Sequence, residues 1–252
     1  MRWNDRLSQK DLMGHLAVMS CAAADAYLTT PQTKWGCECQ LLQKDGSECL
    51  VITDRTTTIL AFRGTSDARD WMTDTDTRKL LFDGIGQTHA GFGHAWRSLE
   101  HSIFEAIPKS TEQLWVTGHS LGGALATIAA KAIDPTVPVH CVVTFGSPRV
   151  FGPATAHDVN WAFQNRIYRV VHSNDVIPRV PGPFRFRHVG TPILIKETPS
   201  DERLTAKRVV FGATFFDLLF ERITGFRFDA IRDHSMDNYA RLQEVEYSGE
   251  LK

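Results

Sequence analysis

Short apolar runs and longer stretches of helical character follow one another along this chain. Alternating or continuous apolar runs, which predict β-strands, lie at 37–42, 49–53, 57–63, 78–82, 114–117, 139–145, 166–171 and 189–195. Helices are predicted from about residue 9, over 91–107, over the Ala-rich stretch 124–130, from about 207 to 223, and from about 235 to 245. Strands that alternate with helices predict an α/β fold in which helices flank a mostly parallel sheet.

The chain predicts one domain. It has 252 residues and no linker rich in Pro, Gly or Ser, so we expect a single domain over 1–252, with a helical cap element around 201–228. The net charge of −1, from 28 basic and 29 acidic residues, gives no indication of nucleic acid as a partner. No metal or organic cofactor is expected, no apolar run predicts a transmembrane segment, and the oligomeric state is left open.

The N-terminal region and the cysteines bear on location. Residues 16–24 are apolar and end in small residues, as a signal peptide does, but Asp5, Asp11 and His15 fit an amphipathic helix better. Five cysteines, an odd number, indicate buried free thiols and a reducing compartment. We therefore expect a cytoplasmic protein, with secretion as the alternative.

A G-x-S-x-G sequence joins a predicted strand to a predicted helix. Gly118, Ser120 and Gly122 follow the apolar run 114–117 and precede the Ala-rich stretch 124–130. Strand, sharp turn and helix form the context in which a serine becomes an exposed nucleophile above an α/β sheet. Ser120 is therefore the predicted nucleophile, although a Gly/Ser turn by itself often only connects two elements.

A serine nucleophile needs a base and an acid that orients the base. In this arrangement the chain order is Ser, then Asp or Glu, then His. Asp175 follows the strand 166–171, and His234 precedes the last predicted helix, so we expect them to be the acid and the base. His188 is the rival base, and His119 is expected to point away from the site.

The negative charge that forms on the substrate during acyl transfer needs backbone N–H donors. One is expected from Leu121, the residue after the nucleophile, and the other from Thr65, at the junction of a strand and a loop. A Gly-Thr pair at a strand end is also ordinary turn chemistry, and Thr65 alone decides nothing.

These motifs together resemble the class 3 lipases, the fungal-type triacylglycerol lipases of the α/β-hydrolase fold. The matching segments are FRGTSDARDWMTD at 62–74, HAGF at 89–92, VTGHSLGGALA at 116–126, TFGSPRV at 144–150, RVVHSNDVIPRVP at 169–181 and DHSMDNY at 233–239. The resemblance implies a triad of Ser120, Asp175 and His234, an oxyanion hole at Thr65 and Leu121, and a short lid over 66–73 that carries Ser66, Trp71 and Met72.

The resemblance implies a lipase that cleaves acylglycerol esters through an acyl-enzyme, with its lipid or ester substrate at a lipid–water interface. The enzymatic alternatives are a phospholipase A1, a soluble-ester esterase or a feruloyl esterase. The non-enzymatic alternative is a binding module on an inactive hydrolase fold, because fold alone does not determine function.

As a helix, the apolar stretch 209–223 would have an apolar face that is wider than packing on one side requires. It is either a helix buried on the sheet or a wall of the acyl pocket. In the second interpretation the wall residues are Phe215, Phe216, Leu219 and Phe220.

Overall fold

The computed structural model describes residues 12–28, 37–64, 78–172, 175–198, 201–208, 234–236 and 239. Its main sheet has eight strands in the order β1-β2-β3-β6-β7-β8-β9-β10. Their bounds are β1 Glu38–Lys44, β2 Ser47–Asp54, β3 Thr57–Phe62, β6 Gln113–His119, β7 Val139–Phe145, β8 Ile167–His172, β9 Thr191–Thr198 and β10 Asp201–Arg208. The central strands β3, β6, β7, β8 and β9 pair in parallel, and the strands at both edges pair antiparallel, which confirms the mostly parallel sheet.

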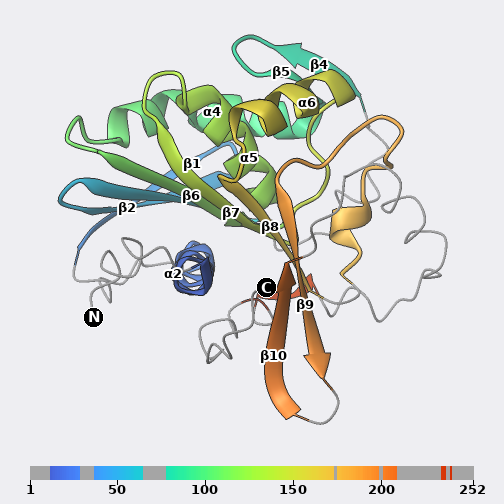
Figure 1. Ribbon diagram of the computed structural model, residues 1–252. Helices are drawn as coiled ribbons and strands as arrows, with labels where there is room; N and C mark the ends of the chain where they lie inside the picture. Colours follow the sequence, from blue (N-terminus) through green and yellow to red (C-terminus); the bar gives the residue numbers. More distant parts are fainter. Residues whose placement is uncertain are drawn as a thin grey trace.

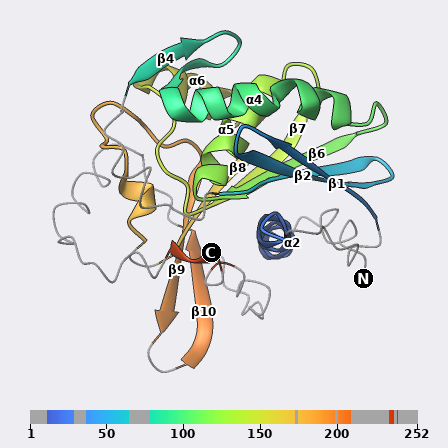
Figure 2. The ribbon, with the colours of Figure 1, turned by 180° about the vertical axis from the view of Figure 1, so that it is seen from behind.

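Helices cover both faces of this sheet (Figures 1 and 2). Helix α2 (Leu12–Asp25) lies on one face, whereas α4 (Ala90–Ala106), α5 (Leu121–Ile133) and α6 (Pro153–Ala162) lie on the other. Side chains alternate along β3 to supply both cores: Leu60 and Phe62 join the core under α4 and α5, while Ile59 and Ala61 join the core under α2. This double coverage explains why every residue of β3 is buried.

The predicted helical stripe at 91–107 is confirmed in α4. Phe92, Trp96, Leu99 and Ile103 are all buried on the face that meets the sheet. The helix ends before Pro108, as expected, because proline has no N–H to continue the hydrogen-bond ladder. A separate hairpin of β4 (Lys79–Phe82) and β5 (Gly86–His89) lies near α6.

The expected helical cap is wrong where the structure describes it. Residues 201–208 form strand β10, which pairs antiparallel with β9, and they include the predicted start of the helix at 207. Pairing with β9 supplies backbone partners that local sequence preference does not reveal, so tertiary context outweighs propensity here. Residues 209–228 lie outside the described residues, and a cap there stays a prediction.

All five cysteines are free thiols. Cys49 and Cys141 are buried, whereas Cys21, Cys37 and Cys39 are half-buried. Among the helices that the structure describes, none is both long enough and apolar enough to cross a membrane.

Candidate active site

The turn between β6 and α5 carries Ser120 in a rarely occupied backbone conformation. Its φ is 58° and its ψ is −127°, and conformations of this kind cost a residue other than glycine about 1–3 kcal/mol. Hydrogen bonds hold the turn in place, from Ser120 N to Phe145 O at 2.9 Å and from Gly123 N to Ser120 O at 2.9 Å. The predicted strand, sharp turn and helix are all present.

Two glycines allow this turn to close against the sheet. A Cβ on Gly118 would collide with the backbone of Gly122, and a Cβ on Gly122 would collide with the carbonyl of Phe62. Glycine is needed at both positions because backbone approaches backbone without room for a side chain. Helix α5 therefore begins directly against the ends of β3 and β6.

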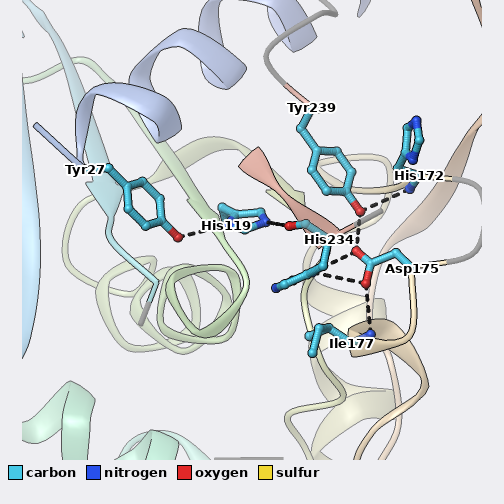
Figure 3. A network of polar contacts seen from close by, with 7 residues as sticks. All are labelled: Tyr27, His119, His172, Asp175, Ile177, His234 and Tyr239. Carbon is cyan, nitrogen blue, oxygen red and sulfur yellow. Dashed lines mark hydrogen bonds and ion pairs between the residues drawn. The ribbon is translucent and has the colours of Figure 1, made fainter. Parts of the chain in front are cut away.

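Asp175 lies beyond the carboxyl end of β8, and its buried carboxylate accepts hydrogen bonds from three residues (Figure 3). Ile177 N donates to Oδ1 at 2.9 Å, and the Tyr239 hydroxyl donates to Oδ2 at 2.5 Å. His234 Nδ1 lies 2.9 Å from Oδ2 and 3.1 Å from Oδ1. The three hydrogen bonds give this buried carboxylate the partners that buried polar groups need.

His234 is buried beside this carboxylate, and only its Nδ1 contacts Asp175, which leaves Nε2 available. Because a carboxylate only accepts, the proton of the neutral ring is on Nδ1, and Nε2 is an acceptor. Among the described residues, neither His234 Nε2 nor Ser120 Oγ has a hydrogen-bond partner, although both atoms are buried. Buried polar atoms without partners are rare and call for a functional explanation.

Gly146 connects this pair to the elbow, the turn at Gly118–Gly122 that carries Ser120, because Ser120 N donates to Phe145, the residue before Gly146. It directly follows β7, has a φ of 58°, and donates its N–H to Val170 O on β8 at 3.0 Å. A Cβ at this position would lie 2.7 Å from Asp175 Oδ2 and 3.0 Å from His234 Nδ1. The pair therefore packs directly on the glycine backbone.

The rival base His188 is engaged elsewhere. Its Nε2 lies 2.6 Å from Pro178 O, an acceptor, so this nitrogen carries the proton. Burial, with the positive charges of Arg169 and Arg149, holds the pKa of His188 well below its usual value. The structure brings His234 to Asp175, and it gives His188 a different partner.

His119 differs from the expectation that it points away from the site. Its ring stacks on that of His234 with 4.5 Å between centroids, and its Nε2 lies 2.7 Å from His234 O. Its Nδ1 lies 2.8 Å from the hydroxyl of Tyr27, the residue that follows α2 by two positions (Figure 3). Sequence reasoning missed both Tyr27 and Tyr239. The position of Tyr239 within DHSMDNY was a usable signal, whereas Tyr27 had none.

The other predicted site residues divide into two groups. Leu121 is the first residue of α5, where backbone N–H groups have no acceptor within the helix. Eight predicted residues lie outside the described residues: Thr65, Ser66, Trp71, Met72, Phe215, Phe216, Leu219 and Phe220. Within the ranges that the structure describes, no group of three or more His, Cys, Asp or Glu residues is arranged to hold a metal ion.

Comparison with known families matches this arrangement to one of them. The family model for class 3 lipases matches residues 59–184, half of the chain. The chain belongs to the class 3 lipase family. The solved structure of lipase II from Rhizopus niveus resembles this chain. It is 25% identical, with a TM-score of 0.72, and the match covers 88% of this chain and 92% of that one. The fold is therefore the α/β-hydrolase fold, as expected.

Two curated relatives are named as secreted enzymes. Secreted mono- and diacylglycerol lipase 1 of Fusarium solani is 32% identical over 177 residues, which cover 66% of this chain and 53% of the relative. Secreted mono- and diacylglycerol lipase A of Penicillium cyclopium is 33% identical over 132 residues, which cover 49% of this chain and 42% of the relative. The chain thus spans about half the length of the curated relatives it matches.

These relatives contradict the expected cytoplasmic location. Their names point to secretion, and the odd number of cysteines misled the sequence interpretation. A free cysteine is most often a small buried apolar residue, so a count of thiols says little about the compartment.

Proposed function

We propose that this chain is a serine carboxylic ester hydrolase that cleaves acylglycerol esters through an acyl-enzyme on Ser120. The observation that carries the proposal is the buried pair of Asp175 and His234, in which Nε2 of the histidine has no partner among the described residues. Ser120, whose strained backbone adjoins His119 on the ring of His234, likewise has an Oγ without a partner there. Membership of the class 3 lipase family supports the same chemistry.

The reaction begins when Ser120 Oγ attacks the ester carbonyl carbon. His234 Nε2 takes the serine proton, and the hydrogen bond from Nδ1 to Asp175 stabilises the imidazolium that forms. The tetrahedral intermediate collapses as His234 returns this proton to the leaving alcohol. Water activated by His234 then attacks the acyl-enzyme, which releases the carboxylic acid and restores Ser120.

Charge on the carbonyl oxygen requires donors positioned in advance. The N–H of Leu121, at the positive end of the α5 dipole, is the first donor in this proposal. Thr65 is the second, on the basis of the family resemblance and of its place after β3. Loss of one such donor costs about 2.7–4 kcal/mol of transition-state stabilisation.

The substrate class is proposed from the relatives and from the apolar stretch 209–223. Mono- and diacylglycerol lipases are among the matches, so we propose acylglycerols at a lipid–water interface as the substrate. The lid role of Ser66, Trp71 and Met72 and the acyl-pocket role of Phe215, Phe216, Leu219 and Phe220 remain predictions.

The test of the nucleophile and base uses three variants of the full chain. Ser120→Ala and His234→Ala should each lower kcat on a short p-nitrophenyl ester by about a millionfold, because the triad acts as a unit. His188→Ala is the matched control, since it removes a half-buried histidine of the same region, and it should keep most of the activity. Wild-type activity in Ser120→Ala would exclude the proposed nucleophile, and greater loss in His188→Ala than in His234→Ala would exclude the proposed base.

A substrate panel tests the ester class. Rates are compared on emulsified di- and triacylglycerol, on phospholipid vesicles and on soluble short-chain and feruloyl esters. We expect the acylglycerols to react fastest, with a jump in rate above their solubility limit if a lid opens at the interface. Faster cleavage of phospholipid or of feruloyl esters would replace the proposed substrate, and a rate without a jump would contradict the lid.

A further inference from the structure

A row of hydrogen-bonded aromatic side chains connects the end of helix α2 to the proposed base (Figure 3). The Tyr27 hydroxyl lies 2.8 Å from His119 Nδ1, and His119 Nε2 lies 2.7 Å from the backbone oxygen of His234. The mechanism above uses neither Tyr27 nor His119. Both residues nevertheless touch the elements on which it depends.

The directions of these hydrogen bonds follow from the chemistry of the groups. The carbonyl of His234 only accepts, so His119 carries its proton on Nε2 and has an acceptor at Nδ1. The Tyr27 hydroxyl is therefore the donor to Nδ1. Burial, together with the neighbouring His234, holds the pKa of His119 well below its usual value, and burial raises the pKa of Tyr27 to about 12. Both side chains are thus neutral, as these directions require.

Tyr27 also packs against the segment that follows strand β3. A Cβ on Gly64 would lie 2.4 Å from Tyr27 Oη and 3.1 Å from Ser120 Cβ, so the Gly64 backbone is in close contact with both side chains. Arg63 lies over the Tyr27 ring, 5.5 Å from its centroid, and pairs with Glu48 at 2.8 Å. The Tyr27 hydroxyl thus contacts both Gly64, after the end of β3, and His119, the residue before Ser120.

His234 is correspondingly held on three sides. Asp175 holds Nδ1, the His119 ring stacks on the imidazole at 4.5 Å, and His119 Nε2 fixes the backbone carbonyl. The contact with the backbone carbonyl is the one that sets where the residue sits, because the other two act on the ring. Catalytic rates fall steeply when a base is displaced by as little as about an ångström.

We propose that Tyr27 and His119 are a positioning pair that fixes the backbone of His234 and the β3 end at Gly64 to one another. The inference rests on the proposed function and adds a positioning role to it. The Tyr27 hydroxyl and the His119 imidazole keep the proposed base, His234, at a fixed distance from the end of β3 that leads to the proposed oxyanion residue. Neither residue exchanges a proton with the substrate.

The test compares Tyr27→Phe, which removes only the hydroxyl, with Tyr168→Phe, a control on β8 outside this row. In Tyr27→Phe we expect kcat on a short p-nitrophenyl ester to fall about 10–100-fold while KM changes little. His119→Gln keeps an amide donor near the position of Nε2 and should retain more activity than His119→Leu. The double variant Tyr27→Phe with His119→Leu should be no worse than His119→Leu alone, because both changes break one connection.

Three kinetic results would overturn the pair: an unchanged kcat in Tyr27→Phe, equal losses in Tyr27→Phe and Tyr168→Phe, or multiplied losses in the double variant. A second measurement does not need turnover. The proton on His234 Nδ1 is followed by NMR, and Tyr27→Phe should shift it whereas Tyr168→Phe should not. If the wild-type chain cleaves no ester, the proposed function fails, and this resonance alone decides the pair: a position unchanged by Tyr27→Phe refutes it.

Discussion

Gly146 offers a direct way to disturb the Asp175–His234 pair without altering either residue. In Gly146→Ala the new methyl group would lie 2.7 Å from Asp175 Oδ2 and 3.0 Å from His234 Nδ1. Both separations are well inside van der Waals contact, so Oδ2 must retreat by roughly half an ångström. That oxygen accepts from His234 Nδ1 at 2.9 Å and from Tyr239 Oη at 2.5 Å, and its retreat strains both hydrogen bonds.

The effect has two components that a matched glycine separates. Alanine at a left-handed φ costs about 1–2 kcal/mol wherever it occurs. Gly46 has a φ of 76° and nothing within 4 Å of its would-be Cβ, so Gly46→Ala carries this backbone cost alone. Overpacking at Gly146 adds about 1–3 kcal/mol to the loss of stability. Displacement of the base should also lower kcat by about a hundredfold.

The assay is guanidinium unfolding of both variants, together with kcat on a soluble ester at pH 8. Gly46→Ala should lose stability and keep its kcat, whereas Gly146→Ala should lose more stability and most of its kcat. If Gly146→Ala is as stable as Gly46→Ala and has the wild-type kcat, the pair does not depend on its packing against this glycine. The reasoning would then be refuted.

Two further predictions concern the buried groups around the site. His119 and His188 have pKa values well below the usual value, so they stay neutral in the folded state. Below the unfolded pKa of about 6.5, these two residues bind protons only in the unfolded chain. The free energy of unfolding should therefore fall by up to about 1.4 kcal/mol per pH unit for each of them. Denaturant titrations from pH 7 to 5 should show this fall, with a smaller slope in His119→Gln; an equal slope would contradict it. Tyr239→Phe removes a donor from the Asp175 carboxylate and should cost about 1.5–3 kcal/mol of stability by thermal unfolding, with a clear loss of kcat. A change no larger than that of Tyr168→Phe would show that this hydrogen bond contributes nothing.

Sequence reasoning succeeded where a local pattern determines the geometry. The elbow at Ser120 follows from two glycines between a strand and a helix, because backbone contacts leave no room for a Cβ there. The pairing of Asp175 with His234 followed from chain order and loop position, and the structure brings these two side chains together. Helix α4 was predicted because its apolar residues recur on one face.

It failed where distant segments decide the outcome. Strand β10 forms because it pairs with β9, and no pattern within 201–208 predicts that pairing. Tyr27 meets His119 across 92 positions of the chain, so no local pattern connects them. Helix α6 was missed although Gly152 and Pro153 at its start form a recognisable helix beginning.

The network around His234 has a consequence for the order in which the protein is made. The ribosome releases Tyr27, the elbow and Asp175 well before His234, and domains begin to fold as they emerge. A nascent chain in which the turn at Ser120 has formed but His234 has not yet emerged holds the proposed nucleophile without its proposed base. The proposed ester cleavage is therefore withheld until His234 has emerged, and the onset of activity during cell-free translation would mark the moment at which His234 first meets Asp175.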